Sequence, residues 1–167
     1  MDKKKIILAV LAVAVAVAVY FIFFHDNDRR AVMKRFNALM EAIEKPSGEG
    51  NISMAAKFQS LSNMVDDHLT AECFSPAIRL DEPSDVMLSN YANARTYATS
   101  ISLSAKDIEI IFTKPDEAQL TCYGTAKFTL RSGETVEETR PAILIFKKKN
   151  GKWLLSSASE RQVFKRQ

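Results

Sequence analysis

Glycine, proline and cysteine are all scarce in this chain, with five glycines, five prolines and two cysteines among 167 residues. So little glycine and proline excludes a collagen-like or low-complexity chain, and two cysteines cannot build a disulfide scaffold. No repeat is found beyond an alanine–valine run near the N-terminus. The length favours a single domain. With 47% of its residues hydrophobic, the chain can form an ordinary core.

An excess of charge of one sign is also lacking. The 23 Lys and Arg residues stand against 20 Asp and Glu, and beyond residue 24 the basic excess falls to one. A nucleic-acid-binding face needs clustered basic residues, so we expect no nucleic-acid partner. The sequence has no phosphate-binding glycine loop, nucleophile elbow, zinc-ligand spacing or dinucleotide fingerprint. We therefore expect no cofactor and no metal.

Charge is absent altogether from residues 6–24, a run of 19 residues. As a helix this run spans about 28 Å, close to the roughly 30 Å hydrocarbon core of a bilayer. A cleaved signal peptide is the alternative, but the run is longer than the apolar region of such peptides and no small-residue cleavage pattern follows it. We predict a cytoplasmic tail over 1–5, a single transmembrane helix over 6–24 and an extracytoplasmic domain over 25–167.

Basic residues lie on both sides of the apolar run, which leaves its orientation open. A short tail with three lysines is easily retained, whereas a long domain is translocated largely regardless of its charge. We therefore favour a single-pass protein of the inner or plasma membrane with its C-terminal domain outside. Four basic residues after the run are candidates for contact with anionic headgroups, with a solvated helix face as the alternative: Arg29, Arg30, Lys34 and Arg35.

Helical spacing of apolar residues predicts three helices. The first, over 26–45, rests on Val32, Phe36, Leu39, Met40 and Ile43, and Pro46 with the glycines that follow it ends the helix. The second, from Asn51 or Ser53 to about Ala71, rests on Met54, Phe58, Leu61, Val65 and Leu69. Residues 73–83 are expected to form a loop with a short strand over 77–80. The third helix is expected over 84–99, with Ser84 as its cap.

Four strands separated by turn residues follow, at about 100–113, 118–130, 135–148 and 152–164. Asn150-Gly151 is a strong signal for a two-residue hairpin. Residues 142–146 are apolar on both faces, so we expect that strand to be central and covered on both sides. The fold class is therefore α+β, with three helices packed on a curved four-stranded antiparallel sheet.

The last hairpin, FKKKNGKWLLSS over residues 146–157, consists of an apolar strand, basic residues, Asn-Gly, and then Trp with alternating apolar residues. With three helices before the sheet, the chain over about 27–164 resembles the nuclear transport factor 2-like superfamily, also called the SnoaL-like or cystatin-like cone fold. The resemblance implies a cone-shaped domain with a cavity between helices and sheet, and frequent dimerisation through the outer sheet surface. Members include isomerases, dehydratases and cyclases, but also non-catalytic binding and assembly domains.

A single-span anchor followed by such a domain also resembles the bitopic assembly component of type IV secretion systems. That resemblance implies protein partners at the cell envelope. Ile143 and Ile145, on the outer face of the third strand, are the interface candidates for a homodimer or such a partner.

Enzymes of this family generally aim an Asp, His or Tyr into the cavity. Here Asp66, Asp67 and His68 form the densest titratable cluster, and His68 with Glu72 has the i, i+4 spacing of a metal-ligand pair or an oriented base. Consecutive helical residues point about 100° apart, so the three cannot converge, and a solvent-facing helix end is the alternative. We therefore name no catalytic residue. Candidates for lining a ligand cavity, with plain core packing as the alternative, are Phe58, His68, Tyr91, Tyr97, Tyr123, Phe128 and Trp153.

Three further features leave alternatives open. Cys73 and Cys122 could form a disulfide or remain free. Residues 51–53 match a glycosylation acceptor, which matters only in a lumenal loop of a host that glycosylates. Glu137, Glu138 and Arg140 on the third strand are expected to form cross-strand charge pairs on an exposed surface.

The sequence thus favours a membrane-anchored, non-catalytic binding or assembly domain at the cell envelope. The alternative is small-molecule binding, or isomerase- or dehydratase-like activity, in the cone cavity.

Overall fold

The computed structural model describes residues 26–74 and 76–161. The chain divides into two compact units, Met1–Lys34 and Arg35–Gln167. Both the expected tail over 1–5 and the expected membrane helix over 6–24 lie outside the described residues. Among the helices that are described, none has the length and apolar character needed to cross a bilayer.

The chain is helical over residues 26–43, as its apolar spacing predicts. Within the second unit, Phe36, Leu39 and Ala42 of this helix are buried. The helix ends just before Pro46, which has no N–H to continue the hydrogen-bond ladder.

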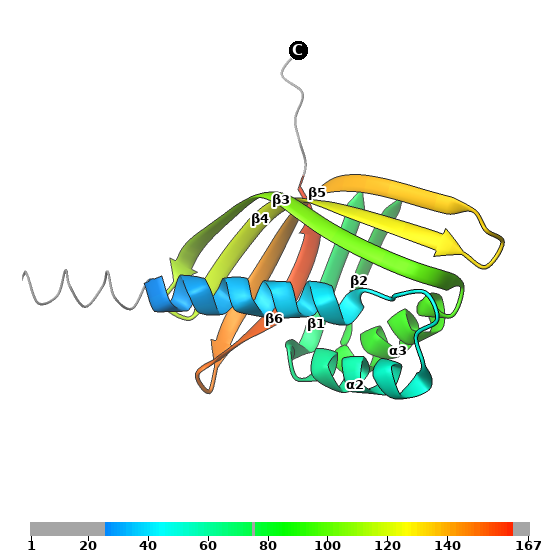
Figure 1. Ribbon diagram of the computed structural model, residues 1–167. Coiled ribbons are helices and arrows are strands. Elements are labelled where there is room, and N and C mark those ends of the chain that lie inside the picture. Colours follow the sequence, from blue (N-terminus) through cyan, green and yellow to red (C-terminus); the bar gives the residue numbers. More distant parts are fainter. Residues whose placement is uncertain (1–25, 75, 162–167) are drawn as a thin grey trace, which may run out of the picture. The chain divides into compact units, whose positions relative to one another are not determined.

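Beyond this helix, the described residues form two further helices and six strands, which are labelled in Figure 1. The helices are α2 (Asn51–Ser62) and α3 (Ser84–Arg95). The strands are β1 (Val65–Phe74), β2 (Ala77–Pro83), β3 (Ala98–Lys114), β4 (Glu117–Leu130), β5 (Thr135–Lys149) and β6 (Lys152–Glu160). They form one sheet in the order β2-β1-β6-β5-β4-β3, in which β1 runs parallel to β6 and all other neighbours are antiparallel.

The prediction of a second helix reaching Ala71 is wrong beyond Ser62. Residues 65–74 form β1, and β2 occupies most of the segment that was expected to be a loop. Val65 and Leu69 are both buried, and a spacing of four residues puts two side chains on one face of a helix and also on one face of a strand. The polar residues between Val65 and Leu69 are compatible with both spacings, so the sequence pattern does not distinguish a helix from a strand here.

The sheet therefore has six strands and is mixed, where the sequence predicts four antiparallel strands. The added pair β1–β2 joins the edge of the predicted meander through the parallel contact of β1 with β6. Such a contact needs a crossover through distant residues, which turn signals along the sequence do not reveal. The four predicted strands themselves are present as β3 to β6, although the predicted end of the last, at Phe164, lies outside the described residues.

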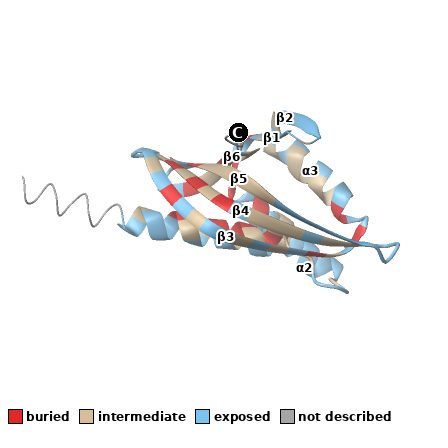
Figure 2. Cartoon of the chain, turned by 90° about the horizontal axis from the view of Figure 1, so that it is seen from above, coloured by how far each residue is buried: buried red, intermediate tan, exposed pale blue. Residues whose placement is uncertain are grey.

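One face of the sheet is concave, and residues 35–43, α2 and α3 lie on that side (Figure 1). Burial alternates most clearly along β4, where Ala118, Leu120 and Cys122 are buried, and buried positions gather in the middle of the sheet (Figure 2). Leu120 and Phe146 are fully enclosed. The pairing of β3 with β4 is irregular between Lys106 and Glu109, where Asp107 has φ 54°. Such a bulge bends a strand, and here it helps β3 to curve over the helices.

The opposite, outer face is not covered by any described helix. Ile143 and Ile145 are half-exposed there, although the apolar run 142–146 predicts a strand covered on both sides. Only the side of β5 that carries Leu144 and Phe146 faces the helices.

Candidate functional site

Small side chains cross the middle of the concave face. Ala71 of β1 pairs with Ala158 of β6, and Gly124 of β4 pairs with Ala105 of β3. A Cβ added at Gly124 would meet nothing closer than the Arg140 carbonyl oxygen at 4.0 Å. Because these residues fill little of the space between sheet and helices, the concave side retains hollows.

The first hollow, which we call the aromatic pocket, has a volume of about 350 Å³. It lies where the first helix ends, between α3 and the β3–β4 pair. Its lining is almost entirely apolar: Ile43, Tyr91, Ala94, Arg95, Tyr97, Ala98, Ile101, Leu103, Phe128 and Leu130.

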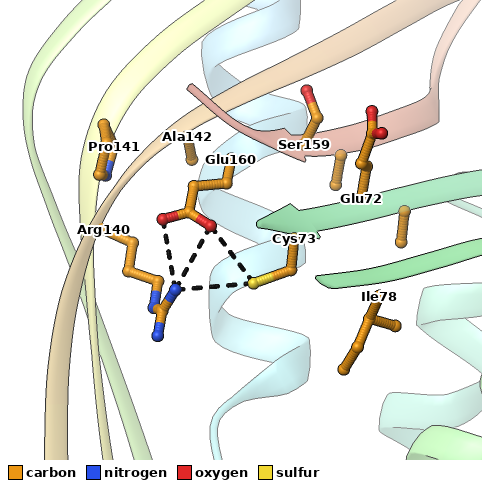
Figure 3. A pocket seen from close by; sticks show the side chains of 10 residues that line it. Glu72, Cys73, Ile78, Arg140, Pro141, Ala142, Ser159 and Glu160 are labelled. Atoms are coloured by element: carbon orange, nitrogen blue, oxygen red, sulfur yellow. Dashed lines mark hydrogen bonds and ion pairs between the residues drawn. The ribbon is translucent and has the colours of Figure 1, made fainter. Parts of the chain in front are cut away.

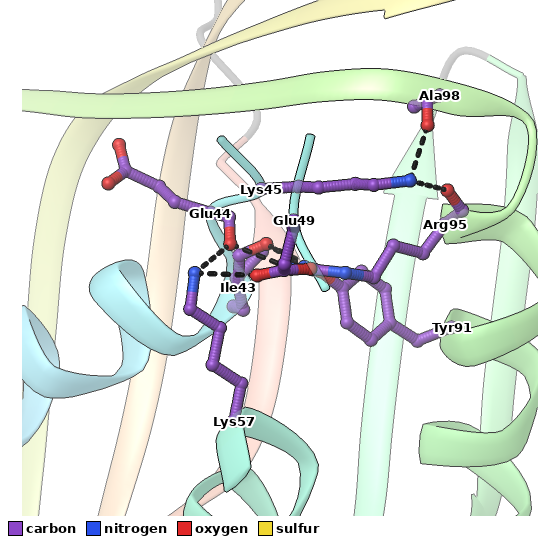
Figure 4. A network of polar contacts seen from close by, with 8 residues as sticks. All are labelled: Ile43, Glu44, Lys45, Glu49, Lys57, Tyr91, Arg95 and Ala98. Atoms are coloured by element: carbon purple, nitrogen blue, oxygen red, sulfur yellow. Dashed lines mark hydrogen bonds and ion pairs between the residues drawn. The ribbon is translucent and has the colours of Figure 1, made fainter. Parts of the chain in front are cut away.

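A buried ion cluster supports one wall of this pocket (Figure 4). Arg95, only 2% exposed, donates from Nη2 to Glu49 Oε2 at 2.5 Å. Its Nη1 donates to the Ile43 carbonyl oxygen and to the Tyr91 hydroxyl, each at 2.6 Å. Lys57 Nζ lies 3.0 Å from the other Glu49 oxygen. The guanidinium thus satisfies carbonyls at the end of the first helix, where a positive charge is favourable.

These contacts fix the protonation states of the cluster. Burial alone raises the pKa of Glu49, but hydrogen bonds from Arg95 and Lys57 outweigh it and leave that pKa below its ordinary value. Burial raises the pKa of Tyr91 above that of a free tyrosine, against the opposing hydrogen bond from Arg95. Since the Tyr91 hydroxyl also donates to the Ile43 carbonyl at 2.6 Å, it is not available as a base.

The second hollow, which we call the Arg140 pocket, has a volume of about 330 Å³ (Figure 3). It lies between the C-terminal ends of β1 and β6 and the middle of β5, and it shares no lining residue with the aromatic pocket. Its walls are the small or apolar residues Ala71, Ile78, Pro141, Ala142 and Ala158, with Glu72, Cys73, Arg140, Ser159 and Glu160 completing the lining.

Arg140 is held between two carboxylates beside this pocket. Its Nη1 lies 3.2 Å from Glu160 Oε1, and its Nε and Nη2 donate to the two oxygens of Glu138 at 3.1 and 3.2 Å. Glu160 Oε2 accepts the Phe74 N–H at 2.8 Å and the Cys73 thiol at 3.3 Å. The Phe74 N–H foremost, with the Cys73 thiol and Arg140, lowers the pKa of Glu160, so this carboxylate is ionised at neutral pH.

The third hollow lies on the outer face and is polar, about 400 Å³ in volume. His68 lines it, and His68 Nδ1 lies 3.1 Å from Asp81 Oδ1. The expectation that His68 and Glu72 share a helical face is wrong, because both are on β1, where four residues span about 13 Å. Asp66 is buried and pairs with Lys149 instead of with His68. Within the described residues, no cluster of His, Cys, Asp or Glu has the arrangement of a metal site.

The structure brings three of the seven cavity candidates together and separates the others. Tyr91, Tyr97 and Phe128 line the aromatic pocket. Phe58 of α2 packs on Tyr91 with ring centroids 5.8 Å apart, so it supports the pocket from behind. Trp153 is buried against Phe112 as plain core. Tyr123 and His68 face outward, away from either concave-side pocket.

The candidates that remain are the four basic residues after the apolar run and the two cysteines. Arg29, Arg30 and Lys34 are exposed, whereas Arg35 is half-buried. Cys73 and Cys122 are not joined in a disulfide. Cys73 is on β1 and Cys122 on β4, with β6 and β5 between them in the sheet, so three strand spacings of nearly 5 Å exceed the reach of a disulfide.

Sequence reasoning missed Arg95, Glu49 and Glu160, and it placed Arg140 on an open surface. A signal for Arg95 is present, since it follows Tyr91 by four residues and so shares its helical face. Arg140 alternates with Ala142, Leu144 and Phe146, which places it on the concave face. Its charge pair with Glu138 exists, but within one strand. Glu49 and Glu160 offer no local signal, because their partners are 46 and 20 residues away.

Comparisons with known proteins identify the fold. No family model matches the sequence, and no curated protein matches it either. A candidate scytalone dehydratase from Novosphingobium aromaticivorans superimposes with a TM-score of 0.70 at 12% identity, covering 86% of this chain and 89% of that one. A candidate dehydratase of the NTF2-like family from Streptomyces avermitilis gives 0.64 at 19% identity, covering 83% and 99%.

The association domain of CaMKII from C. elegans is also similar, with a TM-score of 0.59 at 12% identity over 82% of this chain and 97% of that one. At such identities the likeness concerns architecture alone. The three helices on a curved mixed sheet, with hollows on the concave side, are the nuclear transport factor 2-like fold.

Proposed function

We propose that this domain binds a compact apolar molecule in the aromatic pocket. The observation that carries the proposal is the meeting of Tyr91, Tyr97 and Phe128 around a hollow of about 350 Å³. This volume is within the usual range for small-molecule sites, which are mostly apolar with few polar groups. Apolar surface removed from water contributes about 25 cal/mol per Å², so an apolar ligand gains from nearly every wall.

Binding without catalysis fits the polar groups of this pocket better than turnover does. The Tyr91 hydroxyl and the Arg95 guanidinium are already committed to the end of the first helix. General acid–base catalysis needs a positioned group whose pKa lies near the working pH. Of the residues that line the aromatic pocket, none is a histidine or a carboxylic acid.

Isomerase- or dehydratase-like chemistry is the second candidate, supported by the names of two structures with this fold. In the aromatic pocket such chemistry would use Tyr97, whose side chain reaches solvent at the pocket and is 72% exposed. A Tyr97→Phe variant that binds the same ligand but loses turnover would identify this role. Equal turnover in both proteins would exclude it.

The binding proposal is tested by filling the pocket. Ala94 lines it from α3, and its neighbour Asn93 is exposed and does not line it. With the neutral fluorescent probe N-phenyl-1-naphthylamine, we expect Ala94→Trp to weaken binding at least about tenfold, since an indole occupies the space. Asn93→Trp is the matched control and should bind as the wild type does. Equal binding by both variants, or no binding by the wild type, contradicts the proposal.

An assembly role is a further candidate, carried by the outer face of the sheet. Ile143 and Ile145 are half-exposed there, and Ile111 and Tyr123 of the same face are 48% and 38% exposed. A similar fold serves as an association domain in CaMKII. Exposed apolar residues that gather on one face favour contact with a second copy.

For the location of the domain, we propose anchoring by residues 6–24 in the inner or plasma membrane. The support is the 19-residue run without charge. The full chain is expected to stay with membranes after an alkaline carbonate wash, and Val13→Lys with Val17→Lys should release it, since each lysine costs about 3 kcal/mol at mid-span. Release of the wild type would contradict the proposal.

A further inference from the structure

The Arg140 pocket combines apolar walls with one ion cluster. Three of its walls are alanines, Ala71, Ala142 and Ala158, and Ile78 closes it from β2. Arg140 is 32% exposed and Glu160 is 19% exposed, so the charges are partly withdrawn from water. An ion placed here interacts more strongly than it would at an open surface.

Each donor group of this cluster already has a carboxylate as a hydrogen-bond acceptor. Nε and Nη2 of Arg140 donate to Glu138, and Nη1 donates to Glu160. The Cys73 thiol and the Phe74 N–H both donate to Glu160. An anionic ligand would have to compete with Glu138 and Glu160 for Arg140 and would be repelled by both carboxylates.

The Glu160 carboxylate can still accept further hydrogen bonds. A carboxylate has about four lone-pair positions. Glu160 Oε1 accepts only from Arg140 Nη1 among the contacts of the described residues. Two carboxylates flank one guanidinium, so the cluster carries net negative charge. The lowered pKa of Glu160 keeps that charge in place at neutral pH.

We propose that the Arg140 pocket binds a small organic ammonium ion, with its apolar body against the alanine walls and its N–H groups donating to Glu160. The volume of about 330 Å³ is near the lower end of the range for ligand sites, and it fits one ring or a short branched chain. This site is separate from the aromatic pocket and its proposed apolar ligand, because the two share no lining residue.

A pair of probes of matched shape and opposite charge tests this proposal. Cyclohexylmethylamine and cyclohexanecarboxylate are titrated into the full chain and followed by isothermal calorimetry and by NMR shifts of the amides of residues 71–73 and 158–160. We expect the amine to bind at least about tenfold more tightly than the acid, and to weaken as salt rises. Equal binding of the two probes, or tighter binding of the acid, would overturn the proposal.

Charge-removing variants locate the contact. Glu160→Gln keeps an oxygen that can accept the Phe74 N–H, and we expect it to weaken amine binding at least about tenfold. Glu137→Gln removes one carboxylate from the outer face of the same strand as Arg140, and it should change nothing. An equal effect of both variants would mean that only the overall charge matters and would refute the site.

Two further variants keep the result interpretable. Ala158→Leu fills the pocket without touching a charge, so it must also abolish amine binding even if Glu160→Gln fails to fold. Ala94→Trp blocks the aromatic pocket alone and should leave amine binding intact. Loss of amine binding in Ala94→Trp would place the amine in the other pocket and would defeat this proposal while leaving the proposed function standing.

Discussion

At the scale of single residues, the ion pair between Arg95 and Glu49 takes two charges almost completely out of water. Both side chains are almost fully buried, at 2% and 1% exposure. Charges removed from water stabilise a fold only when each is paired and hydrogen-bonded. Here Glu49 also contacts Lys57, and Arg95 also binds two carbonyls at the end of the first helix. The pair therefore fixes how the 44–50 segment docks on α2 and α3.

The first prediction concerns acid stability. Because the pKa of Glu49 is lower in the folded than in the unfolded chain, its stabilisation is complete above about pH 4.5 and is lost as the pH falls through its folded pKa. We expect Glu49→Gln to lower the free energy of unfolding at pH 7 by about 3 kcal/mol, since Arg95 loses its ionic partner. The difference from wild type should shrink between pH 5 and pH 3 in urea unfolding curves.

Glu109→Gln is the control for this prediction, because Glu109 is exposed on β3. It should follow the wild-type curve within about 0.5 kcal/mol at every pH. A constant difference between Glu49→Gln and wild type from pH 7 to pH 3 would show that Glu49 does not titrate with folding.

The sequence reveals some site residues and conceals others for a physical reason. Tyr91, Tyr97 and Phe128 could be proposed for the cavity because aromatic side chains mark the apolar stripe of a helix or strand. The charged partners could not, since Glu160 meets Arg140 only after β6 has paired with β5. Local periodicity shows which face a residue occupies, but it does not show which distant residue faces it.

At the scale of elements, the local sequence specifies the turn between β5 and β6. It does not specify whether the stretch after α2 becomes a helix or a strand. Asn150 and Gly151 have φ values of 50° and 75°, as the Asn-Gly hairpin signal predicts. Residues 65–71 carry apolar side chains four apart, which suit a helix and a strand equally. Only pairing with β2 and β6 decides for the strand, so tertiary contacts determine β1.

The second prediction tests that turn. Gly151→Ala places a Cβ at φ 75°, where side chains cost roughly 1–2 kcal/mol, so the free energy of unfolding should fall by that amount. Gly124→Ala is a matched control, because Gly124 is not among the glycines with positive φ and an added Cβ would meet nothing closer than 4.0 Å. Its stability should stay within about 0.5 kcal/mol of wild type. Similar losses in both variants, measured by urea unfolding, would mean that turn strain is not the cause.

At the scale of the whole domain, the two faces of the sheet differ in what covers them and in the residues they carry. The concave face holds the core and both pockets, whereas the outer face carries serines, threonines and charges around a small apolar centre. A curved sheet with helices on one side leaves the other side available to a partner. Ligand binding and self-association can therefore coexist, because they use opposite sides of the same strands.

The last prediction follows from that division. Ile143 lies on β5, near the middle of the sheet, with its side chain on the outer face. If two copies associate there, Ile143→Asp buries unpaired carboxylates at the contact and should raise the dissociation constant of the dimer at least about a hundredfold in sedimentation equilibrium. Ser102→Asp adds the same charge to the same face, at an exposed position of β3, and should leave association unchanged.

Because neither side chain reaches the concave face, both variants should bind the probe of the aromatic pocket as the wild type does. A wild-type chain that remains monomeric at high concentration, or a dimer indifferent to Ile143→Asp, would rule out association through this face.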